Sequence, residues 1–445
     1  MSKILDNRRL RFIRVVSVRW RRRLTFLLGG IAVGASAVAL AKLADWAQLA
    51  FAFLLSESRY AALLVTPLGF TLSVYLTSRF FPNSQGSGIP QAIAARQLTG
   101  HAARQRLVSI RIAVGKVLLT LLGLLCGASA GREGPTVQVG ASVMFALGRM
   151  SPRHQPGLIL AGAAAGVAAA FNTPLAGIVF GIEEMSRAYE TRTSSLVIGA
   201  VIAAGLTSLA LVGNYDYFGS SSTMLRNGTD WLAIPLCGIA GGLAGGAFSR
   251  LLIEVARGLP GRLGPLTKQF PLAFAAICGL GVALCGLASG DTIYGTGYAQ
   301  VKSALETDIP LHWDFGLLKL AATALSAISG IPGGIFSPSL AVGAGIGANI
   351  AHLFSGAPLG AFMLLGMVSY FAGVVQAPIT AFVIVTEMTN NHAMVVPLMA
   401  SALIAQATSR LLCPEGIYHA LAKGFLRAST AEASGPRAPD GAAAR

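Results

Sequence analysis

The chain has 445 residues, of which 54% are hydrophobic and only 12% are charged. Soluble domains carry about a quarter of their residues as charged side chains, so this composition excludes an ordinary soluble protein and predicts an all-α integral membrane protein in contact with the lipid bilayer. The net charge of +16 does not indicate nucleic-acid binding, because the basic residues lie beside a membrane span and not on a soluble domain with base-stacking aromatic side chains.

The first 23 residues are rich in Arg and lead directly into an apolar segment that starts at Leu24. Positive charge beside a first span favours the cytoplasmic side of a membrane, so residues 1–23 are predicted to form a basic cytoplasmic segment. A cleaved signal peptide is the alternative, because the small residues at 35–37 resemble a cleavage site. The many apolar segments that follow favour a first span that stays in the protein.

Apolar segments recur along the rest of the chain. They cover residues 24–54, 60–81, 106–130, 135–150, 157–186, 194–213, 231–256, 270–289, 315–329, 336–354, 360–388 and 393–412. Several are shorter than the roughly 20 residues of a straight span, or are interrupted by Gly and Pro, which predicts tilted and broken helices. Residues 427–445 are small and polar, and we predict a disordered tail there.

The sequence contains an internal repeat. When GREGP at 131–135 is aligned with GIFSP at 334–338, Lys116 falls on Lys319. One residue later in register, NTPLAGIVFGIEEM at 172–185 falls on QAPITAFVIVTEMT at 376–389. These shared landmarks predict two homologous membrane repeats, which we place at 24–213 and 231–426 and join by a polar linker at 214–230.

Basic residues are frequent at 96–111 and 250–268, whereas the linker at 214–230 is nearly free of them. The two basic stretches are therefore predicted to be cytoplasmic and the linker external. Such an arrangement gives the two repeats opposite topologies. A duplicated membrane fold with matching Gly and Pro interruptions predicts a transport site at the repeat interface.

Three Gly-rich breaks precede apolar helices: GSGIPQ at 86–91, GREGP at 131–135 and GGIFSP at 333–338. The start of a helix presents unpaired N–H groups and the positive end of its dipole. In a bilayer such groups must be buried in protein or line a cavity. Each break alone is best explained as a simple turn, but three in a duplicated membrane protein favour a site that holds an anion.

These three breaks and Tyr418 of GIYHALAKG resemble, in order, the four anion-pathway motifs of the CLC chloride channel and transporter family. The resemblance extends over nearly the whole chain, from about residue 24 to 426. It implies an inverted-topology repeat of tilted, broken helices and a homodimer with one pore per subunit, with chloride and protons as the transported ions and no cofactor.

The resemblance also implies a role for individual residues. The central chloride would be held by the hydroxyls of Ser87 and Tyr418 and by the backbone N–H groups of Ile335 and Phe336. A further set would shape the helix starts: Gly86, Gly88, Pro90, Gly131, Arg132, Gly134, Pro135, Gly334 and Pro338.

Glu133 resembles the external gating glutamate of the family, which competes with chloride as a carboxylate and moves away when protonated. A lone charge in mid-membrane costs at least ~3 kcal/mol, so Glu133 must bind the N–H groups or take up a proton. An ion pair with Arg132 is the alternative, although adjacent helical residues do not face each other. For Arg132 itself, a raised local potential for anions and a structural role both stay open.

Glu184 matches the internal proton-transfer glutamate of the exchanger members, and the repeat places Met388 at the equivalent position. Glu183 matches its neighbour near the inner proton entry. However, Glu183 aligns with Glu387 and has Arg187 four residues later, so a structural role is equally favoured. Two other acids have a basic neighbour at helical spacing, and we predict the ion pairs Asp45–Lys42 and Glu254–Arg257.

We therefore predict a chloride/proton antiporter, with a passive gated chloride channel of the same fold as the alternative. Histidines and cysteines lack metal-binding spacing and no catalytic constellation or nucleotide motif appears, so we expect no metal, no nucleotide-sensing domain and no enzymatic activity. A membrane-embedded enzyme and a cation-coupled carrier are both disfavoured, the latter because its path would need acidic or carbonyl ligands. We place the chain in a bacterial inner (plasma) membrane with a cytoplasmic N-terminus.

Overall fold

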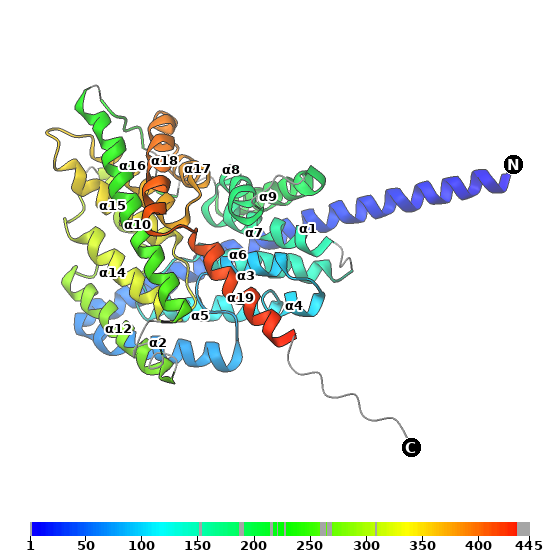
Figure 1. Ribbon diagram of the computed structural model, residues 1–445, viewed down its shortest axis with the longest axis horizontal. Helices are drawn as coiled ribbons and strands as arrows, with labels where there is room; N and C mark the ends of the chain where they lie inside the picture. The colour runs from blue at the N-terminus through cyan, green and yellow to red at the C-terminus, as the bar shows by residue number, and fades with distance from the viewer. Residues whose placement is uncertain are drawn as a thin grey trace, which may run out of the picture.

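The computed structural model describes residues 2–150, 154–186, 191–213, 217–219, 221–226, 228–258, 264, 269–307 and 309–433. These residues form a bundle of helices from which α1 extends toward the N-terminus (Figure 1). The elements are α1 (Ser2–Glu57), η1 (Arg59–Ala61), α2 (Ala62–Phe80), α3 (Ile89–Gln97), α4 (His101–Gln105), α5 (Ile110–Leu125), α6 (Glu133–Leu147), η2 (Gly148–Met150), α7 (Gln155–Phe171), α8 (Pro174–Phe180), η4 (Gly181–Ser186), α9 (Thr191–Val212), η5 (Thr229–Leu232), α10 (Ala233–Arg257), α12 (Pro271–Ala288), α13 (Tyr298–Thr307), α14 (Phe315–Ile328), α15 (Phe336–Ala351), α16 (Leu359–Val375), α17 (Pro378–Thr389), α18 (Val395–Leu412) and α19 (Ile417–Ala433).

Seven helical stretches of the described chain are long and apolar enough to cross a bilayer. They are Arg23–Glu57, Arg59–Phe80, His101–Leu125, Ser195–Val212, Thr229–Arg257, Pro271–Ala288 and Val395–Leu412. Large apolar side chains are exposed along them, for example Trp46 at 66% and Phe53 at 70% on α1. A lipid environment explains such exposure, and the prediction of a multi-pass membrane protein is confirmed.

Two long apolar segments of the sequence are each divided into two helices. The segment 157–186 breaks at Asn172 (φ 56°) between α7 and α8, and 360–388 breaks at Gln376 (φ 60°) between α16 and α17. Both residues adopt the left-handed conformation that ends a helix, and each is followed two residues later by a proline that starts the next one. The breaks fall at equivalent positions of the repeat.

The same helix pairings occur in both halves of the fold. Helix α6 packs on α7 as α15 packs on α16, and α1 contacts α9 as α10 contacts α18. Helices α7 and α16, with 17 residues each, are buried along almost their whole length. At 1.5 Å per residue they are too short for a straight span, but they can line the inside of a protein. The predicted inverted repeat of broken helices is confirmed.

The two halves are joined by a pair of reciprocal contacts. The Glu183 carboxylate accepts hydrogen bonds from the backbone N–H groups of Ile379 (3.2 Å) and Thr380 (2.6 Å) at the start of α17. Glu387 accepts in the same way from Leu175 (3.1 Å) and Ala176 (2.7 Å) at the start of α8. Each carboxylate thereby caps a helix of the opposite half, where the dipole favours negative charge.

Three predictions of local structure were wrong. Helix α19 continues to Ala433, so residues 427–433 are not disordered, and 434–445 lie outside the described residues. Asp45 pairs with Arg132 at 2.5 Å instead of with Lys42. Glu254 pairs with Arg250 at 2.8 Å instead of with Arg257, because the side chain one turn earlier offers the better geometry.

Some predictions fall on parts of the chain that are not described. Arg187, the alternative partner of Glu183, is one of these residues, as are 259–263 and 265–268 of the basic stretch 250–268. The described part of the linker is tied to the helices: Phe218 N–H donates to Met388 O (3.1 Å), and Ser221 N–H donates to Thr389 O (3.0 Å) at the end of α17.

Candidate anion pathway

The three Gly-rich loops singled out in the sequence meet in space. Gly131 and Gly334 exchange two backbone hydrogen bonds of 2.7 Å each. Gly86 donates its N–H to Ile331 O (3.1 Å) and accepts from Gly333 N–H (3.0 Å). Because α3, α6 and α15 begin directly after these loops, their N-termini and the positive ends of their dipoles converge on one region.

Glycines allow the loops to approach this closely. A Cβ on Gly134 would lie 2.7 Å from Ser87 Oγ and 3.2 Å from Gly334 Cα, atoms that belong to the two other loops. Gly88 adopts φ +96°, and a Cβ there would lie 2.7 Å from Gln138 Cβ. A side chain at either position would therefore push the helix starts apart.

The residues expected to hold chloride surround this meeting point. Neither the Ser87 hydroxyl nor the Tyr418 hydroxyl has a hydrogen-bond partner among the described residues. Tyr418 is fully buried and its ring stacks on that of Phe336 at 6.0 Å. Ile335 and Phe336 lie at the first positions of α15, where backbone N–H groups have no intrahelical acceptor. Buried, unpartnered donors of this kind suit an anion.

A buried lysine supports the first loop in a way that the sequence did not predict. Lys116 Nζ donates to Gly86 O (2.7 Å) and Gln85 O (3.3 Å). Its repeat partner Lys319 donates to Gly295 O (2.8 Å) and Ile293 O (2.7 Å). The second half therefore has a counterpart of GSGIP, namely GTGYA at 295–299, which lies 209 residues later and so falls outside the 203-residue register of the repeat.

Glu133 is the first residue of α6 and is 1% exposed. Its Oε1 accepts a hydrogen bond from the Tyr217 hydroxyl at 3.0 Å, and its Oε2 is buried without a hydrogen-bond partner among the described residues. Arg132 donates to Asp45 at 2.5 Å and to Ala41 O at 2.7 Å. Arg132 thus anchors the start of α6 to α1, in agreement with the structural alternative for this residue.

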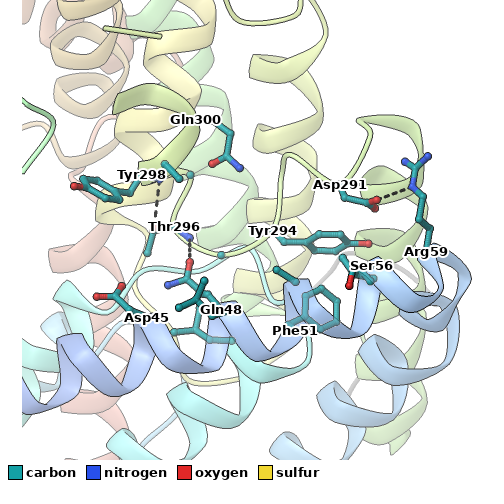
Figure 2. A pocket seen from close by; sticks show the side chains of 17 residues that line it. Asp45, Gln48, Phe51, Ser56, Arg59, Asp291, Tyr294, Thr296, Tyr298 and Gln300 are labelled. Atoms are coloured by element: carbon teal, nitrogen blue, oxygen red, sulfur yellow. Dashed lines mark hydrogen bonds and ion pairs between the residues drawn. The ribbon is translucent and has the colours of Figure 1, made fainter. Parts of the chain in front are cut away.

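Two neighbouring cavities are both lined by Asp45, the ion-pair partner of Arg132. The smaller, of about 140 Å³, is lined by Lys42, Asp45, Arg132, Tyr217 and Tyr298, among others. The larger, of about 650 Å³, shares Asp45 and Tyr298 with it. Figure 2 shows these two residues at one end of the larger cavity and the Arg59–Asp291 ion pair at the other. Tyr217, which lines the smaller cavity, is also the hydrogen-bond donor to Glu133.

Glu184 follows α8 and lies in η4, a single π-helical turn. It is 3% exposed, and its Oε1 lies 3.7 Å from His419 Nδ1. Because His419 directly follows Tyr418, α19 brings a residue expected to hold chloride and a titratable neighbour of Glu184 together. The sequence search for metal spacing missed this histidine, since only the fold places it near Glu184. A π-helical turn often marks a functional site.

Glu183, adjacent to Glu184, points elsewhere, since its carboxylate caps α17. No group of three or more His, Cys, Asp or Glu side chains that could hold a metal ion was found in the described part of the chain. The five cysteines are free thiols.

The family model described as voltage gated chloride channel matches residues 69–410. The chain belongs to this family. Among its relatives, the H(+)/Cl(-) exchange transporter ClcA of Yersinia pseudotuberculosis serotype IB (strain PB1/+) is 32% identical, with 94% of this chain and 91% of the relative covered. The protein of the same name from Salmonella arizonae is 31% identical, with 97% and 95% covered.

Solved structures of the family have the same fold. A slow cyanobacterial Cl⁻/H⁺ antiporter superposes with a TM-score of 0.76 at 26% identity, covering 92% of this chain and 98% of that one. A CLC-type fluoride/proton antiporter superposes with a TM-score of 0.77 at 24% identity, covering 90% and 97%. At that identity the second likeness shows the fold alone, and it confirms the predicted arrangement of inverted repeats.

Proposed function

We propose that this protein is a secondary active antiporter that moves chloride across the membrane in exchange for protons. The observation that carries the proposal is the convergence of three helix N-termini on buried, unpartnered hydroxyls, with a carboxylate at the start of one helix. Helix N-termini bind anions without a full positive charge. A carboxylate in the same place binds the same donors and can also carry a proton.

Chloride would occupy the central site between the Ser87 and Tyr418 hydroxyls and the first N–H groups of α15. Phe336 supports this by closing one side with an apolar wall, because its ring contacts Phe371 at 4.7 Å and Phe180 at 6.0 Å. A dry wall strengthens the attraction between the anion and the helix dipoles, since little water screens it.

Glu133 would serve as the external gate and proton acceptor. As a carboxylate it occupies the N–H groups of the converging helices and blocks the anion path. On protonation it loses its attraction for them, and chloride takes its place. Each exchange of carboxylate for chloride thereby takes up or releases a proton.

Glu184 would pass the proton between Glu133 and the cytoplasm. The proton route would pass close to the chloride site, because His419, which lies 3.7 Å from Glu184, directly follows Tyr418 in the chain. The burial of Glu184 next to His419 supports a proton route that is separate from the chloride exit. A passive channel does not need a second acid to carry protons. The presence of both Glu133 and Glu184 therefore favours exchange over the channel alternative, in agreement with the names of the relatives.

The test uses purified protein in liposomes, with a chloride gradient as the only driving force. We expect protons to move uphill in the direction opposite to chloride, measured as a pH change in the external medium. Protein-free liposomes are the control. Chloride movement without uphill proton movement would identify a passive channel and overturn the proposal.

The same proposal includes a homodimer in a bacterial inner membrane, with a cytoplasmic N-terminus. Exposed apolar side chains on α8, α9, α17 and α18 support a protein interface, including Leu175, Leu206, Ile379 and Leu403. The half-buried Glu183 and Glu387 caps belong to the same helix group, and a second subunit would shield these charges from lipid. Light scattering of the detergent-solubilised protein should give twice the chain mass of 45.8 kDa; a single chain mass would contradict the dimer.

A further inference from the structure

Tyr217 is a buried tyrosine from the segment that connects the two repeats. It is 1% exposed, and its hydroxyl donates a 3.0 Å hydrogen bond to Glu133 Oε1. The same hydroxyl lies 3.3 Å from Ser337 Oγ near the start of α15. It therefore connects the gate carboxylate of α6 to the first turn of α15.

The position of this hydroxyl is fixed by its surroundings. The Tyr217 ring meets those of Phe171, Phe218 and Tyr298 edge-on, with centroids 5.4, 5.1 and 4.9 Å away. The neighbouring Phe218 N–H binds Met388 O at the end of α17 at 3.1 Å. Aromatic packing and a backbone anchor hold the tyrosine in one orientation, so its hydroxyl is directed at Glu133 before any ion arrives.

We propose that Tyr217 is a latch for the gate: a positioning residue that holds the Glu133 carboxylate in the anion path and sets the pH at which the gate opens. The inference rests on the proposed function of Glu133. A tyrosine hydroxyl can donate to a carboxylate, and a hydrogen bond to an ionised acceptor is stronger than one to a neutral acceptor. The latch therefore favours the closed, deprotonated gate over the protonated one that leaves the path.

Other charged and titratable groups around Glu133 are few and lie on different elements. Arg132 precedes it on α6 and places its guanidinium 5.9 Å from the Tyr217 ring. Lys42 and Asp45 of α1 line the smaller cavity, which Arg132 and Tyr217 also line, and Tyr418 of α19 belongs to the candidate chloride site. Among the described side chains around Glu133, a direct hydrogen bond to its carboxylate is seen from Tyr217.

The experiment compares the pH profile of chloride efflux from liposomes for the wild type and Tyr217→Phe. Phenylalanine keeps the ring packing and removes only the donor. Without the hydrogen bond from Tyr217, the deprotonated Glu133 carboxylate is less stable and takes up a proton at a higher pH. We therefore expect the pH of half-maximal flux to rise by about one unit. On the alkaline limb of the profile this shift corresponds to a flux increase of up to about tenfold.

Two controls separate a latch from a purely structural tyrosine. Tyr298→Phe keeps a ring that packs on the Tyr217 ring and removes only the Tyr298 hydroxyl, which neighbours Lys302. This variant should leave the pH midpoint of chloride flux unchanged. In a Glu133→Gln background, Tyr217→Phe should cause no shift. A variant whose flux changes by the same factor at every pH, or whose shift persists without Glu133, overturns the latch. Because the readout is chloride flux, a shift supports the latch even if uphill proton movement, and with it the antiport proposal, fails.

Discussion

Replacing Glu133 by Gln is expected to abolish proton movement driven by a chloride gradient while chloride continues to cross the membrane. Glutamine has the shape of the protonated acid but cannot release a proton, and it carries no charge for the helix N-termini to hold. The gate is then permanently in its weakly bound form. In liposomes, the uphill pH change should fall to the level of protein-free vesicles, and chloride flux should lose its dependence on pH.

A matched control for this variant is Glu57→Gln, which removes a carboxylate from the exposed end of α1. It should retain both proton coupling and the pH profile of the wild type. If Glu133→Gln kept its coupling, the gate assignment would be wrong. If it stopped chloride as well, Glu133 would be required to build the site, and its competition with chloride would not explain the coupling.

The sequence predicts where the helices of the candidate site begin, because Gly and Pro have few structural alternatives there. GREGP and GIFSP fix where α6 and α15 begin, and the repeat shows that these two starts are equivalent. In the structure these two equivalent loops pair with each other, because Gly131 and Gly334 exchange backbone hydrogen bonds. Residues that act through their backbone geometry are thus visible in the sequence before any contact is known.

The sequence does not reveal contacts between side chains that are far apart in the chain and are brought together by packing. Local helical spacing predicted Lys42 as the partner of Asp45, but the fold brings Arg132 closer from another helix. Tyr217 lies in a polar stretch that reads as a linker, and nothing in its neighbours in sequence points to Glu133. His419 follows a recognisable motif, yet only the packing of α19 places it near Glu184.

The structure also separates two adjacent acids that sequence alone could not. Glu183 accepts hydrogen bonds from Ile379 N, Thr380 N and Thr380 Oγ1. Its carboxylate therefore caps α17, a helix of the other half. Glu184 is turned into the protein beside His419. A single π-helical turn carries both, and because adjacent residues of a helix do not face each other, the two side chains contact different elements.

Glu184→Gln is therefore expected to remove proton coupling, whereas Glu183→Gln should keep it and weaken the fold. Glutamine at 184 interrupts the inner proton route but lies off the chloride path, so chloride flux should persist without an uphill pH change. Glutamine at 183 replaces charge-assisted hydrogen bonds to α17 by neutral ones, at a cost of about 1–3 kcal/mol, which should lower the midpoint of thermal unfolding in detergent.

The two variants control for each other, because they make the same chemical change one residue apart. Glu387→Gln should resemble Glu183→Gln, since its carboxylate caps α8 through Leu175 and Ala176 in the same way. Loss of coupling in Glu183→Gln with an unchanged unfolding midpoint would instead place Glu183 on the proton route. A fall in the midpoint that is shared by Glu183→Gln and Glu387→Gln but absent from Glu184→Gln would identify the reciprocal caps as the contacts that hold the two repeats together around the pathway.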